Sequence, residues 1–184
     1  MEALDALLTR VSVPRLHDPA PDAAQRQLLF RAALRAPDHG QLRPWRFLTI
    51  EGAARERLGE LFAQAVSASG AKPEMLAKAR AMPLRAPLLV VVIASPKTHF
   101  KVPESEQLLS AGCAAHGIVI AAHALGLGAI WRSGDLSHDP LVKAGLGVGE
   151  KEQIVGFIYL GRAEGERRTP QELDPGDFVT AWQG

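Results

Sequence analysis

The segment Leu88–Ala94 reads Leu-Leu-Val-Val-Val-Ile-Ala and follows a proline at position 87. Its residues favour β-structure, and no position in the run is polar. A strand that is apolar at every position is typical of a sheet that is covered on both faces. The segment therefore predicts a central strand, and the rest of the chain is expected to supply the elements that cover it.

The segments around this strand carry helical and strand patterns without a steady alternation. Apolar residues at helical spacing, together with proline and glycine boundaries, predict the helices, and alternating or continuous β-favouring runs predict the strands. Helices are expected over residues 2–9, 22–36, 53–67, 73–81 and 103–126 and from Pro140, and further strands over residues 45–50, 127–132 and 154–160. Because two helices precede the first strand and two more separate it from the second, the pattern favours an α+β layer protein.

Length and composition predict one globular domain over residues 1–184. With 47% apolar residues the chain can bury a substantial core, and 21 basic against 20 acidic residues leave a formal charge of only +1. Such a balance gives no electrostatic reason to expect nucleic acid or an acidic membrane surface as a partner. One cysteine cannot form an internal disulfide, and residues 1–10 lack a signal-peptide pattern, so a cytoplasmic location is expected.

The run from Leu108 to Trp131 contains no charged residue and is long enough for a bilayer. It also contains four glycines and two histidines, and Gly126 and Gly128 divide it into a helix and a short β segment. A helix buried in the core of a soluble protein explains this pattern better, so no membrane span is expected.

Two groups of residues suggest chemistry that the pattern does not support. Cys113, His116 and His123 lie on one predicted helix, but no cluster of further ligands accompanies them, so core or interface roles are simpler and no metal site is expected. Asp38 beside His39 suggests a base with an orienting acid. Adjacent residues rarely share one site in the geometry this needs, and no nucleophile is identifiable.

Three polar clusters carry donors that suit an anion. They are Arg10 with Ser12 after the first helix, Arg35 with His39 in a proline-bounded loop, and residues 131–133 at the end of a predicted strand. Guanidinium and hydroxyl groups form charge-assisted hydrogen bonds with phosphates. The loop chemistry alone equally allows a helix stop followed by a buried tryptophan, but three such clusters together predict one anionic cofactor.

The clusters belong to an ordered set of motifs that resembles the nitroreductase family, in its short YdjA-type branch, from residue 3 to about residue 161. The set comprises Arg10-x-Ser12, Arg35-Ala36-Pro37-Asp38-His39, Pro44-Trp45, Ser110-Ala111-Gly112-Cys113, Gly126-x-Gly128-x-x-Trp131-Arg132-Ser133 and Ile154-Val155-Gly156-Phe157-x-Tyr159-Leu160-Gly161. The unchanged order of the motifs makes this resemblance more specific than any one of them.

The resemblance implies an α+β fold with a central, mainly antiparallel sheet flanked by helices. It also implies a homodimer with FMN at the subunit interface and a tail, residues 162–184, that packs on the partner subunit. By motif, the FMN contacts are Arg10, Val11, Ser12, Trp131, Arg132 and Ser133 from one subunit and Arg35 and His39 from the other. The segment associated with NAD(P) is Ala121, Ala122, His123, Ala124, Leu125 and Gly126.

The implied activity is reduction of nitroaromatic or quinone-like acceptors by NAD(P)H, with ping-pong hydride transfer through the flavin N5. The flavin carries the redox chemistry, which agrees with the lack of an identifiable nucleophile. The chain departs from the family pattern at Val11, where the family commonly has a second arginine. The missing guanidinium is expected to weaken FMN retention. A flavin-binding protein without rapid turnover, and an FMN-dependent dehydrogenase or oxidase of a specific metabolite, remain alternatives.

Overall fold

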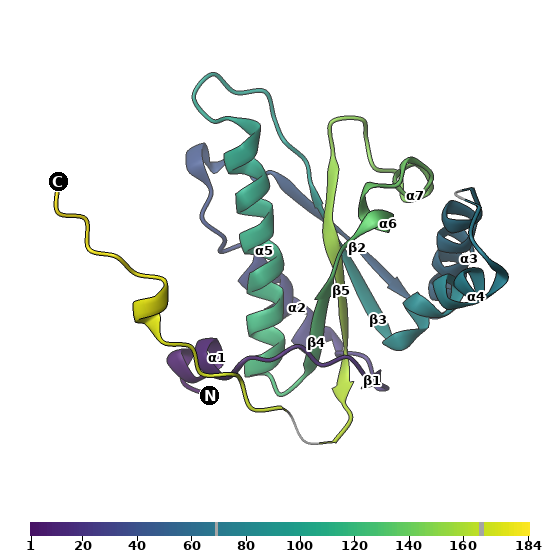
Figure 1. The fold of residues 1–184 in the computed structure, drawn as a ribbon, viewed down its shortest axis with the longest axis horizontal. Helices are drawn as coiled ribbons and strands as arrows, with labels where there is room; N and C mark the ends of the chain where they lie inside the picture. The colour runs from purple at the N-terminus through teal and green to yellow at the C-terminus, as the bar shows by residue number, and fades with distance from the viewer. Residues whose placement is uncertain (69, 166–167) are drawn as a thin grey trace.

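The computed structural model describes residues 1–68, 70–165 and 168–184 of the chain. The elements in chain order are α1 (Ala3–Thr9), β1 (Leu16–His17), α2 (Ala23–Ala33), the 3₁₀ turn η1 (His39–Gln41), β2 (Trp45–Glu51), α3 (Ala53–Ala68), α4 (Pro73–Ala81), the 3₁₀ turn η2 (Met82–Arg85), β3 (Leu88–Ala94), α5 (Glu104–Ala124), β4 (Gly128–Arg132), α6 (Asp135–His138), α7 (Pro140–Gly145), β5 (Gln153–Ala163) and the 3₁₀ turn η3 (Pro175–Asp177) (Figure 1).

The strands form one five-stranded sheet in which every described pairing is antiparallel. β3 lies between β2 and β5, with Phe47 opposite Val92 and Val91 opposite Phe157. The other edge of β5 pairs first with β4 and then with β1, whose Leu16 lies opposite Ala163. The predicted α+β fold with a mainly antiparallel central sheet is confirmed.

β3 is the predicted central strand, with all seven residues buried. Because successive side chains of a strand point to opposite faces, its residues divide between two cores. The odd-numbered residues pack with α3 and α4, and the even-numbered residues pack with α2 and α5. Figure 1 shows the corresponding layers, with α5 on one side of the sheet and α3 and α4 on the other. The continuous apolar run is therefore explained by helices on both faces.

α5 supplies most of the cover on one face and packs closely on α2. Close approach is possible because Gly117 lacks a side chain: a Cβ there would lie 3.0 Å from the carbonyl oxygen of Ala32. By length and composition alone α5 is long and apolar enough to cross a membrane, although half of its most apolar window is buried inside the fold. Core helices of soluble proteins pass the same test, so this helix is weak evidence for a membrane.

Several boundaries differ from the sequence-based expectation. α2 ends at Ala33, and after the cap residue Leu34 the amides of Arg35 and Ala36 donate to carbonyls only three residues back, so the chain tightens before Pro37. β5 continues to Ala163, two residues into the segment expected to form the tail. β1 and α6 have only two and four residues, too few for a periodic pattern to reveal.

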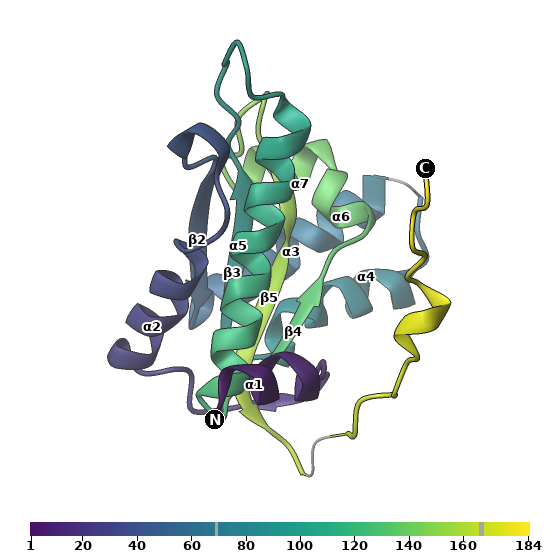
Figure 2. The same cartoon turned by 90° about the vertical axis from the view of Figure 1, so that its left-hand side faces the viewer.

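The C-terminal tail extends away from the sheet, and although it crosses α1 in Figure 1, it lies apart from α1 in Figure 2. Its large apolar side chains are exposed, with 73% of Phe178, 70% of Val179 and 90% of Trp182 open to solvent. A contiguous apolar segment with this exposure is typical of a surface that binds another chain. The predicted packing of the tail on a partner subunit stays a prediction.

Candidate functional site

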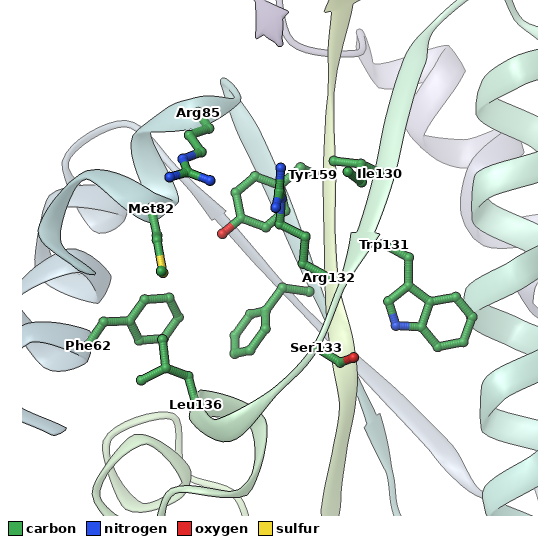
Figure 3. A pocket seen from close by; sticks show the side chains of 10 residues that line it. Phe62, Met82, Arg85, Ile130, Trp131, Arg132, Ser133, Leu136 and Tyr159 are labelled. Atoms are coloured by element: carbon green, nitrogen blue, oxygen red, sulfur yellow. The ribbon is translucent and has the colours of Figure 1, made fainter. Parts of the chain in front are cut away.

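A pocket of about 350 Å³ lies on the α3 and α4 side of the sheet, beside the end of β4 (Figure 3). Its volume falls within the range of small-molecule sites, roughly 300–1,000 Å³. The lining combines aromatic and aliphatic walls with two guanidinium groups and two hydroxyl groups. The lining residues are Phe62, Met82, Arg85, Ile130, Trp131, Arg132, Ser133, Leu136, Phe157 and Tyr159.

Arg132, at the end of β4, is held inside this pocket by an aromatic side chain from β5. Its guanidinium carbon lies 5.7 Å from the centre of the Tyr159 ring, a cation–π contact. The Nε atom of Arg132 is buried, and it has no hydrogen-bond partner among the described residues. Buried donors are nearly always satisfied, so an orphaned one at a pocket points to a ligand acceptor.

Arg85 brings a second guanidinium to the same pocket from η2 (Figure 3). Burial raises the pKa of the Tyr159 phenol, and the positive charges of Arg132 and Arg85 partly offset that rise. The two arginines therefore act on one buried hydroxyl from neighbouring elements. A pocket with flat apolar walls and two positive charges suits an aromatic ligand that carries or develops negative charge.

The loop after α1 lies against the neighbouring part of β4. The amide of Val13 donates a hydrogen bond of 2.9 Å to the carbonyl of Ala129. This loop lines a cavity of about 340 Å³, and its members Pro14 and Arg15 also line a third cavity of about 450 Å³. The cavity at this loop is lined by Val11, Ser12, Val13, Pro14, Arg15, Ala163, Glu164 and Arg168. The third cavity is lined by Pro14, Arg15, Leu16, His17, Leu84, Arg85 and Arg132.

The three cavities are neighbours that share lining residues, and together they are called the trough. Pro14 and Arg15 join the loop cavity to the third cavity, and Arg85 and Arg132 join the third cavity to the pocket at β4. The structure thus brings Val11 and Ser12 to one end of the trough and residues 131–133 to the other. Arg10 ends α1 next to the trough without lining these cavities.

The side chains of residues 131–133 do not all point the same way. The Trp131 indole Nε1 donates to the Val155 carbonyl over 3.3 Å and lies on Gly156, where a Cβ would come within 2.1 Å of it. Figure 3 shows the indole pointing toward α5, away from Arg132. Because side chains alternate along a strand, the Arg132 side chain points into the trough, whereas the Trp131 side chain lies on the opposite face of β4.

Arg35 and His39 lie elsewhere in the chain, in the loop between α2 and β2. His39 Nδ1 lies 2.8 Å from Glu106 Oε2 at the start of α5, and neither Arg35 nor His39 lines the trough. One subunit therefore does not bring the two groups of predicted FMN contacts together. The expectation that Arg35 and His39 approach from a partner subunit stays a prediction.

The predicted NAD(P) segment, residues 121–126, forms the last turn and cap of α5. Within it Ala122 and His123 are buried, and His123 Nε2 lies 2.9 Å from Thr9 Oγ1, a contact that ties α1 to α5. Ala124 and Gly126 are exposed. A nucleotide role for this segment stays a prediction, and its two buried residues already have a packing role.

Residues 7–162 match the Nitroreductase family. The chain is a member of that family. The predicted family and its class, oxidoreductase, are confirmed. This nitroreductase is 44% identical over 181 residues to the putative NAD(P)H nitroreductase YdjA of Escherichia coli K12, a match that covers 98% of the chain and 99% of that protein. It is 38% identical over 182 residues to a putative NAD(P)H nitroreductase of Haemophilus influenzae, with the same two coverages.

Solved structures share the fold of this nitroreductase at low identity. A nitroreductase-like family protein from Bacillus cereus has a TM-score of 0.84 at 20% identity and covers 100% of this chain and 97% of its own. A nitroreductase with bound FMN from Bacteroides fragilis has a TM-score of 0.76 at 23% identity, with 100% of both chains covered. The nitroreductase-like fold is confirmed, and the relatives' names carry the FMN and NAD(P)H that the resemblance implied.

Sequence reasoning missed two basic residues of the nitroreductase trough, Arg85 and Arg168. Arg85 directly precedes the Ala-Pro that comes before β3, and its place just before a buried strand is the feature of the sequence that could have identified it as a site residue. Arg168 lies in the segment expected only to pack on a partner. In the part of the chain that the structure describes, no group of three or more His, Cys, Asp or Glu residues is placed to hold a metal ion.

Proposed function

We propose that this nitroreductase binds FMN along the trough and uses NAD(P)H to reduce nitroaromatic or quinone-like acceptors by a ping-pong reaction. The observation that carries the proposal is the buried Nε of Arg132, which has no partner among the described residues and lies in a pocket with a second guanidinium, Arg85. The relatives named as NAD(P)H nitroreductases and the fold neighbour with bound FMN support the choice of ligand.

The donor set of the trough fits the two chemically different ends of FMN. Arg15, Arg168 and the hydroxyl of Ser12 line one end, where they would hold the phosphate through charge-assisted hydrogen bonds. Arg85 and Arg132 line the other end among aromatic and aliphatic side chains, where they would hold the flavin ring. Arg15 and Arg168 also supply positive charge near Val11, where the family commonly has an arginine.

FMN, when bound, would supply the redox chemistry, which is hydride transfer through N5 between NAD(P)H and the acceptor. The protein's own residues bind the flavin, orient it and tune its redox properties. Arg132 is pre-positioned by the Tyr159 ring and places positive charge beside the ring system, which favours its electron-rich reduced form. Phe62, Met82 and Leu136 exclude water from that end of the trough.

We also propose that the working form is a homodimer in which Arg35 and His39 of one subunit reach the FMN held mainly by the other. Large apolar side chains exposed on α1 and α5 support it, because such exposure is typical of surfaces that bind another chain. They include 69% of Leu4, 73% of Leu8 and 70% of Leu109. The exposed tail adds further apolar area. A cytoplasmic location stays a prediction.

An anaerobic titration tests the proposal. The purified protein is loaded with FMN, freed of excess cofactor and titrated with NADH and with NADPH while the visible flavin absorbance is followed. We expect a yellow protein that is bleached by at least one nucleotide and recovers its colour when a nitroaromatic compound is added. A protein that takes up no FMN contradicts the proposal. A yellow protein that neither nucleotide bleaches favours the flavin-binding alternative.

A further inference from the structure

We infer that Glu106 is the positioning residue for His39, fixing the imidazole so that one ring nitrogen is aimed at the flavin. This inference rests on the proposed function, in which His39 reaches the FMN of the partner subunit. It names a residue, 67 positions away in the sequence, through which the loop contact is made.

The loop between α2 and β2 has an unusual backbone that its own residues and α5 hold in place. Gln41 and Arg43 have φ values of 53° and 50°, in the left-handed region that side chains other than glycine rarely adopt. The Asp38 carboxylate accepts hydrogen bonds from the amides of Leu42 and Arg43, over 3.1 and 2.7 Å. Backbone strain of this kind persists only where the surroundings determine it, and it clusters at functional sites.

These contacts separate the roles of the two acids near His39. Both oxygens of Asp38 are engaged by loop amides, so Asp38 shapes the backbone. The imidazole instead pairs with Glu106, whose Oε2 lies 2.8 Å from Nδ1. The sequence suggested Asp38 as an orienting acid for His39, although adjacent residues rarely have the geometry this needs, and in the structure the acid beside His39 comes from the first turn of α5.

The pair fixes which ring nitrogen is available. An ionised carboxylate only accepts hydrogen bonds, so Nδ1 of His39 carries the hydrogen and donates it to Glu106. Nε2 is then free to bind another group, and the hydrogen bond between Nδ1 and Glu106 sets the orientation of the imidazole ring. Val102, just before α5, packs 3.5 Å from the Cβ position of Gly40, which keeps the loop seated on the same helix start.

The exposure of the pair argues against a purely structural purpose. In this chain 58% of the His39 side chain and 48% of the Glu106 side chain are open to solvent. Exposed ion pairs contribute little to folding stability. The side chain of Arg35, also exposed, makes no hydrogen bond or ion pair within residues 1–68, 70–165 and 168–184. The loop thus presents an oriented imidazole and an unengaged guanidinium on one exposed surface.

The first experiment measures the FMN dissociation constant of the full-length protein by flavin fluorescence. Glu106→Ala is compared with Glu104→Ala, which removes an acidic side chain from the same first turn of α5 and serves as the matched control. We expect Glu106→Ala to weaken FMN binding roughly three- to tenfold, the effect of one hydrogen bond of ordinary strength. Glu104→Ala should change it less than twofold, and both should leave the thermal unfolding midpoint close to wild type. Glu106→Gln should stay closer to wild type than Glu106→Ala, because its amide oxygen still accepts from Nδ1.

A double-mutant cycle shows whether Glu106 acts through His39. Once His39→Ala has removed the imidazole, adding Glu106→Ala should cause no further loss of FMN affinity. A further loss of the same size would overturn the inference, because Glu106 would then contact the ligand itself. Equal affinities for wild type and Glu106→Ala would also overturn it. Failure of the wild-type protein to bind FMN is a separate result that removes the proposed function instead.

Discussion

The guanidinium of Arg132 lies over the ring of Tyr159, 5.7 Å from its centre, so a charged residue at the end of β4 is oriented by the neighbouring strand β5. β4 and β5 are paired along this stretch, with Ile130 opposite Tyr159. The ring therefore fixes the arginine before any ligand arrives. Such preorganisation reduces the conformational entropy that binding would otherwise cost.

Arg132→Ala should strongly weaken FMN binding. Hydrogen bonds to a charged group contribute about 1.5–3 kcal/mol, so the dissociation constant should rise by one to two orders of magnitude. Fluorescence titration with FMN measures the change. Arg57→Ala, which removes an exposed guanidinium from α3 outside the trough, is the control and should bind like wild type. Equal affinities for the two variants would show that Arg132 does not hold the cofactor.

Gly156→Ala should destabilise the sheet beside the site. A Cβ at this position would lie 2.1 Å from Trp131 Nε1 and 2.8 Å from the Arg132 carbonyl oxygen, so both the indole and the end of β4 must shift. Overpacking of this kind costs about 1–3 kcal/mol, which urea unfolding measures. Adding Trp131→Ala should recover part of the lost stability, because it removes the clash with the indole. The recovery should be incomplete, because the clash with the Arg132 carbonyl oxygen remains. A Gly156→Ala protein of wild-type stability would refute the packing described for Trp131.

The pair between Glu152 and Arg46 predicts an acid-sensitive component of stability. Hydrogen bonds from Arg46 lower the pKa of Glu152 from 4.5 to about 2, despite an opposing effect of burial. The contribution is complete above the unfolded pKa and is lost as the pH falls from about 4.5 toward 2. Because the Arg46 side chain is 34% exposed, we discount the full shift and expect about 1–2 kcal/mol.

Urea unfolding of wild type and Glu152→Gln between pH 7 and pH 3 checks this contribution. The variant should be less stable at pH 7, and the difference between the two proteins should shrink at pH 3. A difference that stays constant over this range would rule out the linkage. The amide of Gly149 also donates a hydrogen bond to the Glu152 carboxylate, within the turn before β5.

The tail should matter for association more than for the fold of one chain. Phe178 and Trp182 are 73% and 90% exposed, and burying two aromatic side chains in a partner contributes several kcal/mol. Phe178→Ala with Trp182→Ala should therefore weaken the dimer at least tenfold in analytical ultracentrifugation. A dimer constant that the double substitution leaves unchanged would contradict the proposed packing of the tail.

Much of the fold follows from local sequence patterns. β3 was predictable because seven consecutive apolar residues leave no exposed face, and α5 because its apolar stretch is too long for a strand. The two-residue β1 was not predictable, because it exists only through its pairing with the end of β5. Patterns within a segment do not encode such long-range pairings.

The candidate site shows the same division. Arg132 and Ser133 were predictable from their motif at the end of a strand. Arg85 and Glu106 were not, because each matters only through a distant segment: Arg85 lines the same pocket as Arg132 of β4, and Glu106 pairs with His39 of η1. The opposite orientation of Trp131 follows from strand alternation, which the motif alone does not reveal.

The location of FMN is the central claim, and a crystal structure of the protein grown with FMN tests it most directly. The account predicts flavin density against Arg85 and Arg132, with the phosphate in the cavity lined by Ser12 and Arg168. It also predicts that Arg35 and His39 of a second subunit approach the same molecule. Flavin density outside the trough, with Arg132 Nε still without a partner, would contradict the account.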